Sequence, residues 1–74
     1  MDIKVKQVPY AAPGKYKFEV RYGMANYTCY LCPGASLNNL VVDARGKDVT
    51  TDLVGCRVMI ACHHELRTEP PVLK

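Results

Sequence analysis

The stretch of sequence that decides the fold is KYKFEVRY, residues 15–22. Its aromatic and aliphatic side chains alternate with charged ones without a break, which is the period of a strand with one buried and one solvated face. Pro13-Gly14 precedes the stretch and Gly23 follows it, and these residue types signal turns. The stretch therefore predicts an antiparallel strand whose aromatic face packs on the core and whose charged face lies in water.

Other segments alternate in the same way and predict further strands of one sheet: residues 3–8, 26–31 and 56–62. In residues 26–31, the side chains of Tyr27, Cys29 and Leu31 share one face. In residues 56–62, the side that we expect in the core consists of Cys56, Val58, Ile60 and Cys62. A turn is expected just before this last strand, at residues 52–55.

Residues 36–45 allow two interpretations. A helix is indicated by the helical spacing of Leu37, Leu40, Val41 and Ala44, with Ser36 as an N-cap and Gly46 after the end. A hairpin is indicated instead by two short arms, residues 40–43 and 47–50, around Ala44-Arg45-Gly46. Asparagine and valine, which are frequent here, are poor helix formers. We therefore favour the hairpin, following one short helical turn.

Together the segments predict a mainly β or α+β fold, in which a small single-layer or barrel-like antiparallel sheet of four to five strands is accompanied by at most one short helix. The chain has 74 residues, the size of one small domain. We assign residues 1–69 to this domain and residues 70–74, which begin with prolines, to a C-terminal tail. A chain this short has little core to spare for a deep substrate cavity.

The hydropathy of the chain indicates a soluble protein. No apolar run approaches the roughly 20 residues that a membrane-spanning helix needs, and the opening MDIKVKQVPY lacks the apolar region of a secretory signal. We therefore expect a monomer in the cytoplasm. In that compartment thiols stay reduced.

The positive charge of the chain is concentrated at its start. The formal net charge is +3, and residues 1–21 alone account for it, because the bases and acids of the remaining sequence balance. If residues 3–8 pair with residues 15–22, the exposed face they share carries Lys4, Lys6, Lys17 and Arg21. These side chains are our candidates for contact with an acidic partner, either a protein or a nucleic acid.

The cysteines raise the question of zinc. Cys29 and Cys32 have the C-x-x-C spacing of half a zinc site, and a complete set of ligands would add Cys62 and either His63 or His64. The chain supplies no matching second pair, and neighbouring residues on a strand point to opposite faces. We therefore predict that the protein binds no metal or other cofactor and that Cys56 and Cys62 are core residues.

Catalytic motifs are missing from the sequence, which has no nucleophile elbow, no glycine-rich phosphate loop and no zinc-protease motif. An enzyme is therefore not expected. Several tyrosines lie among the N-terminal bases, a pattern that small β-barrels use to stack single-stranded nucleic acid. Strand alternation directs Tyr16, Phe18 and Tyr22 away from the charges, so we favour a core role for these rings.

With its opening MDIKVKQVPY, its basic N-terminal third and its lack of a catalytic motif, the chain resembles small bacteriophage host-takeover proteins. More narrowly, it is similar to the small Xanthomonas-phage transcription regulators that bind host RNA polymerase. This resemblance implies a non-enzymatic regulator that contacts the β′ subunit, inhibits initiation and promotes readthrough of terminators. The resemblance is one of general appearance along the whole chain, and it assigns no contact residue. The alternative is a small nucleic-acid-binding module, either an OB-like single-strand binder or a zinc-stabilised domain.

Overall fold

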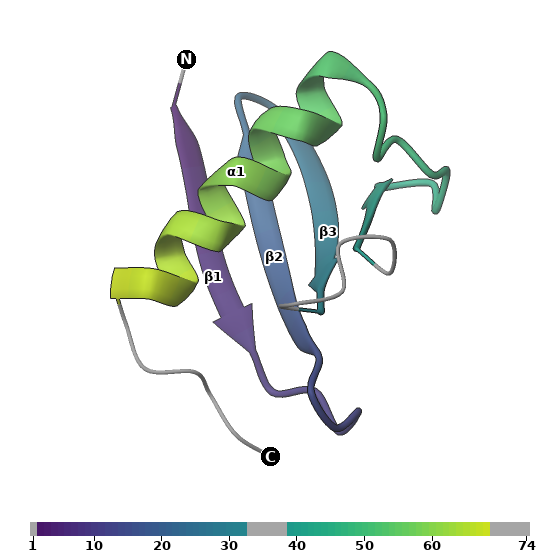
Figure 1. Cartoon of the computed structure of the whole chain (residues 1–74). Helices are drawn as coiled ribbons and strands as arrows, with labels where there is room; N and C mark the ends of the chain where they lie inside the picture. The colour runs from purple at the N-terminus through teal and green to yellow at the C-terminus, as the bar shows by residue number, and fades with distance from the viewer. Residues whose placement is uncertain (1, 33–38, 69–74) are drawn as a thin grey trace.

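The computed structural model describes residues 2–32 and 39–68. Four strands and one helix follow one another along the chain: β1 (Ile3–Val8), β2 (Tyr16–Tyr22), β3 (Ala25–Leu31), β4 (Leu40–Asp43) and α1 (Leu53–Thr68). The strands form one antiparallel sheet in the order β1-β2-β3-β4, and α1 lies across one of its faces (Figure 1). The prediction of a small antiparallel sheet of four to five strands with at most one helix is confirmed.

The stretch KYKFEVRY forms β2 and supplies the centre of the core, as predicted. Phe18 is fully buried and Val20 is nearly so, while Lys17, Glu19 and Arg21 point to the other face of the sheet, as strand alternation requires. Cross-strand partners share a face, so Cys29, which pairs with Phe18, is buried with it. The core between sheet and helix is completed by Leu31, Val41, Val49, Val58 and Cys62.

Two turns explain the tight connections of the sheet. Gly23 and Met24 alone join β2 to β3, with Gly23 at a φ of +63°, as expected for the first central residue of a type II′ turn. Beyond β4, the chain folds back in the predicted hairpin. The Asp43 N–H donates to the Lys47 carbonyl at 2.9 Å, and the Val49 N–H donates to the Val41 carbonyl at 2.8 Å. The hairpin interpretation of residues 40–50 is therefore confirmed.

The predicted strand at residues 56–62 is wrong, because these residues lie inside α1. The helix buries Val58 and Cys62, which are four residues apart, and partly buries Val54 and Leu66 at the same spacing, so one helical face meets the core. Ile60, which we expected in the core, is 68% exposed. Cys56, for which we expected the same, is also exposed. The alternating residues of this segment would share one face of a strand, but only Val58 and Cys62 lie on the buried face of the helix.

The predicted turn at residues 52–55 is also wrong, because it is the start of α1. The Cys56 N–H donates to the Asp52 carbonyl at 2.9 Å, which is the first hydrogen bond of the helix. Gly55 is buried against the backbone of the preceding segment. A Cβ atom at this position would overlap the carbonyl oxygen of Val49 and lie 2.7 Å from its carbonyl carbon. Glycine thus permits the close approach that seats the helix.

Two expectations fall outside the described residues: the short helical turn before β4 and the tail at residues 70–74. The helix of the described part of the chain is neither long nor apolar enough to cross a bilayer.

Candidate binding face

The candidate site is the face of the sheet opposite α1, which we call the open face. No helix in residues 2–32 or 39–68 covers it (Figure 1). Strand alternation and the observed register assign the following side chains to it: Lys4, Lys6, Val8, Lys17, Glu19, Arg21, Asn26, Thr28, Tyr30, Leu40 and Val42. The open face therefore combines a charged region with an aromatic and aliphatic one.

The basic end of the open face consists of Lys4, Lys6 and Arg21. Lys4 is directly opposite Arg21, and Lys6 is directly opposite Glu19, so the cations surround a single carboxylate in the middle of the sheet. A shallow depression of about 480 Å³ lies over these side chains and extends to Asn26 and Thr28. Like charges gathered on neighbouring strands repel one another, and an acidic ligand would relieve that repulsion.

Asp43 lies at the far end of this depression, but its pairing with Tyr27 places its side chain on the opposite side of the sheet from the cations of the basic end. Its carboxylate accepts the backbone N–H groups of Arg45 and Lys47 at 2.9 Å and 3.0 Å. The Lys47 N–H is the largest cause that lowers the pKa of this carboxyl below its usual value. Asp43 is thus engaged in holding the β4 turn and is not one of the open-face side chains.

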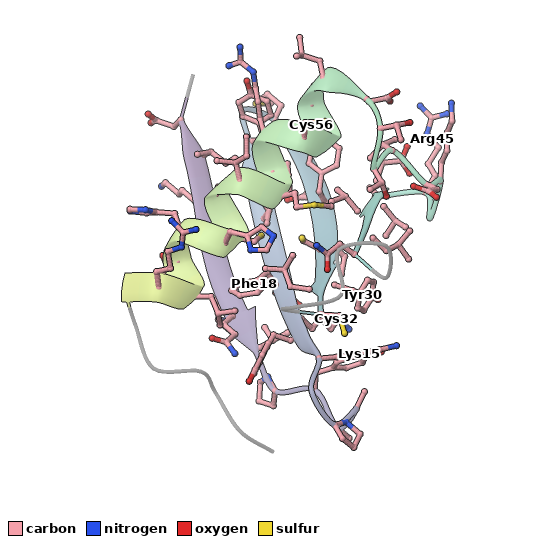
Figure 2. All side chains as sticks on the ribbon, viewed as in Figure 1. Lys15, Phe18, Tyr30, Cys32, Arg45 and Cys56 are labelled. Carbon is pink, nitrogen blue, oxygen red and sulfur yellow. The ribbon has the colours of Figure 1, made fainter. Side chains whose placement is uncertain are left out.

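The aromatic end consists of Tyr10, Tyr30, Leu40 and Val42. The rings of Tyr10 and Tyr30 are tilted by 54° with their centroids 5.5 Å apart, a favourable aromatic geometry. The Lys17 ammonium lies 5.8 Å from the centre of the Tyr30 ring, within the range of a cation–π contact. A second depression, of about 370 Å³, is lined by this end and by Lys15. Figure 2 shows Tyr30 and Lys15 at the same end of the sheet.

The four candidate cations do share one face, as strand pairing predicted, but they do not form one cluster. Lys4, Lys6 and Arg21 lie at the basic end, whereas Lys17 contacts Tyr30 at the aromatic end. Lys17 and Arg21 are four positions apart on β2, about 13 Å at the usual rise of a strand. Sequence reasoning did not bring Tyr10, Leu40 and Val42 together, because their meeting depends on the loop before β2 and on the position of β4.

The candidate zinc ligands are not brought together as a set. Cys29 on β3 and Cys62 on α1 face each other in the core, and the pKa of the Cys62 thiol is raised, first by its hydrogen bond with Cys29 and then by burial. Cys32 lies just beyond β3, where its N–H donates to the side-chain carbonyl of Asn39 at 2.8 Å. Throughout residues 2–32 and 39–68, no three His, Cys, Asp or Glu side chains are arranged to hold a metal ion.

The buried pair Cys29 and Cys62 therefore fits the packing of small apolar side chains between sheet and helix better than it fits half of a metal site. Of the two remaining ligand candidates, His63 is half-buried and His64 is exposed on α1.

Comparison with known proteins gives no family for this chain: no family model, no curated protein and no solved structure matches it.

Proposed function

We propose that the protein is a non-enzymatic regulator that binds a host protein through the open face, with bacterial RNA polymerase as the leading candidate. The observation that carries this proposal is the basic end, where Lys4, Lys6 and Arg21 gather on a sheet face that no described helix covers. Cations held on a rigid sheet steer an acidic surface into register and raise the rate of association.

The composition of the open face favours a protein partner over a nucleic acid. Glu19 lies among the cations of the basic end, and its carboxylate would repel a phosphate backbone. The aromatic end adds tyrosine and aliphatic side chains beside the charges. Protein interfaces commonly combine aromatic residues and arginine at their centre with a polar rim.

RNA polymerase enters the proposal through the resemblance to the Xanthomonas-phage regulators. That resemblance implies contact with the β′ subunit, inhibition of initiation and antitermination, and it places the action in the bacterial cytoplasm. The charge of the open face is compatible with this idea, because a basic binder requires an acidic or mixed surface on its target.

A nucleic-acid-binding module is the second candidate, and the aromatic end favours it. Tyr30 lies on the open face with Lys17 beside its ring and Tyr10 against it. Aromatic rings next to basic side chains form the stacking platforms of single-strand binders. Salt separates the two classes, because phosphate neutralisation makes log K fall steeply and linearly with log salt for any base sequence.

The test is the affinity of the immobilised protein for purified bacterial RNA polymerase, measured by biolayer interferometry. The variant Lys4→Glu/Arg21→Glu removes the basic end by charge reversal. The control variant Lys47→Glu/Arg67→Glu makes the same change in net charge at exposed positions outside the open face. We expect the first variant to bind about tenfold more weakly or worse, and the control to bind like the unmodified protein.

Equal loss in both variants would contradict the proposed site, because it would show a response to net charge alone. No binding of RNA polymerase, together with micromolar and steeply salt-dependent binding of single-stranded DNA or RNA, would replace the proposal with the second candidate.

A further inference from the structure

The two edges of the sheet differ in whether another segment is hydrogen-bonded to them. The outer edge of β4 is covered by the returning segment, whose Val49 N–H and Lys47 carbonyl bond to Val41 and Asp43. The Thr50 hydroxyl oxygen also accepts the Val41 N–H at 2.9 Å. At the opposite edge, β1 pairs with β2 on one side and with no strand of the described residues on the other. A free edge of this kind is a template for a further strand.

The hydrogen-bonding groups that β1 leaves free follow from its register. The Gly23 N–H donates to the Asp2 carbonyl at 3.2 Å, and antiparallel ladders alternate bonded and non-bonded pairs. The even-numbered residues of β1 therefore bond to β2. The backbone N–H and C=O groups that point away from the sheet belong to Ile3, Val5 and Gln7.

The surfaces on the two sides of this edge differ in chemistry. On the open face, the edge carries Lys4 and Lys6. On the helix side, an apolar groove of about 380 Å³ lies between the start of β1 and α1 and is lined by Ile3, Tyr22, Arg57, Ile60, Ala61 and His64. Ile60 is 68% exposed there, although it is a large aliphatic residue. A strand added to β1 would direct alternate side chains to the lysines and to this groove.

A second copy of the chain is a poor occupant of this edge. If β1 of one copy pairs antiparallel with β1 of a second copy so that all the outward backbone groups are bonded, Val5 lies opposite Val5. In this register Lys4 of each copy lies opposite Lys6 of the other. Like charges directly opposite one another on paired strands are destabilising. Acidic side chains at the same positions would instead be attracted.

We propose that the edge of β1 receives an extended segment of a partner protein in which acidic residues alternate with apolar ones. The acidic residues lie beside Lys4 and Lys6, and the apolar residues lie toward the groove at Ile60. The backbone of the segment bonds to the outward groups of Ile3, Val5 and Gln7, which is recognition by strand addition. This inference rests on the proposed function and specifies the chemistry of the partner.

The test uses a capped synthetic peptide of about six residues, the length of a typical strand, in which glutamate and valine alternate. A control peptide of identical composition carries its glutamates in one block and its valines in another. Affinity and amide hydrogen exchange of the 74-residue chain are followed by NMR. We expect the alternating peptide to bind about tenfold more tightly than the block peptide and to slow exchange at the Val5 and Gln7 amides by about tenfold or more.

Variants of one edge residue separate backbone pairing from side-chain contact. Gln7→Pro removes an outward N–H group without removing a bond to β2, and proline is tolerated at such an edge position. Gln7→Ala changes the same side chain and keeps the N–H group. We expect Gln7→Pro to weaken the alternating peptide about tenfold or more and Gln7→Ala to leave it within about threefold, with unchanged circular dichroism in both.

Equal affinity for the two peptides, or equal loss in the two variants, would overturn the inference. Slow exchange at Val5 and Gln7 before any peptide is added would overturn it as well, because the edge would already be occupied by the chain itself or by a second copy. Binding of RNA polymerase that depends on the basic end, without any binding of the alternating peptide, would refute the strand addition alone. Failure of both would also refute the proposed function.

Discussion

Replacing Gly55 by alanine tests how α1 is seated on the sheet. In an open helix position this change stabilises by about 0.5–1 kcal/mol, because alanine has the higher helix propensity. Here the added Cβ would overlap the carbonyl oxygen of Val49 and lie 2.7 Å and 3.3 Å from the carbonyl carbons of Val49 and Thr50. Overpacking of this kind costs about 1–3 kcal/mol, so the clash and the propensity act in opposite directions.

The clash should outweigh the gain in helix propensity, because the obstructing atoms belong to the backbone and not to the flexible end of a side chain. The Val49 N–H is held by the Val41 carbonyl at 2.8 Å, so this segment cannot move away without breaking the hairpin. We expect Gly55→Ala to lower the free energy of unfolding by about 2 kcal/mol. For a domain of 74 residues, this is a drop of about 8–16 °C in Tm.

The assay is thermal and urea unfolding followed by circular dichroism at 222 nm, a helix-sensitive wavelength at which about 2 kcal/mol is readily resolved. Cys56→Ala is the matched control, since it introduces alanine at the adjacent exposed position of the same helix turn. It removes only a long hydrogen bond from the Cys56 thiol to the Thr50 carbonyl, 3.8 Å between sulfur and oxygen, and should change stability by less than about 0.5 kcal/mol. A Gly55→Ala protein as stable as the unmodified one, or more stable, would refute the described contact between α1 and the segment before it.

Three further predictions concern charge, core and metal. The pKa values of Asp43 and Asp48 are both lowered, mainly by the Lys47 N–H for Asp43 and by the Thr50 hydroxyl for Asp48. The stability that these carboxylates contribute is therefore present at neutral pH and is lost as the pH falls through and below the ordinary value of 3.8. The double variant Asp43→Asn/Asp48→Asn should flatten the dependence of Tm on pH between about 5 and 3. Cys62→Ser should lower the free energy of unfolding by about 1–3 kcal/mol, because it buries a hydroxyl in an apolar core. Cys56→Ser should change the free energy of unfolding by less than about 0.5 kcal/mol. Equal effects of the two substitutions in urea unfolding would contradict the assignment of these residues to a helix. Elemental analysis should find no stoichiometric zinc, and a chelator should leave the circular dichroism unchanged; one zinc per chain with loss of signal on chelation would contradict this expectation.

The sheet could be predicted from local alternation, whereas the helix could not. Residues 15–22 alternate over their full length with turn residues on both sides, so no other period fits them. Residues 56–62 are too few to separate the two periods, because Val58 and Cys62 lie on one side of either a strand or a helix. A window extended from Val54 to Leu66 keeps the four-residue spacing of the buried positions over a length greater than that of a typical strand, which favours a helix.

The charged part of the candidate site was predictable for the same reason as the sheet. Alternation on β1 and β2 was enough to assign Lys4, Lys6, Lys17 and Arg21 to one face. The aromatic end was not predictable, because it depends on a contact between a loop residue, Tyr10, and the strand residue Tyr30. The free edge of β1 depends in turn on the order of the strands, and alternation within each strand carries no information about that order.

The central claim is that the open face binds the host protein, and a lysine-acetylation footprint tests it most directly. The protein is treated with an acetylating reagent alone and in complex with purified bacterial RNA polymerase, and modification is measured by mass spectrometry. We predict that Lys4 and Lys6 lose about tenfold in reactivity in the complex while Lys47, exposed on the β4 turn, reacts as before. Protection of Lys47 with undiminished reaction of Lys4 and Lys6 would contradict the account.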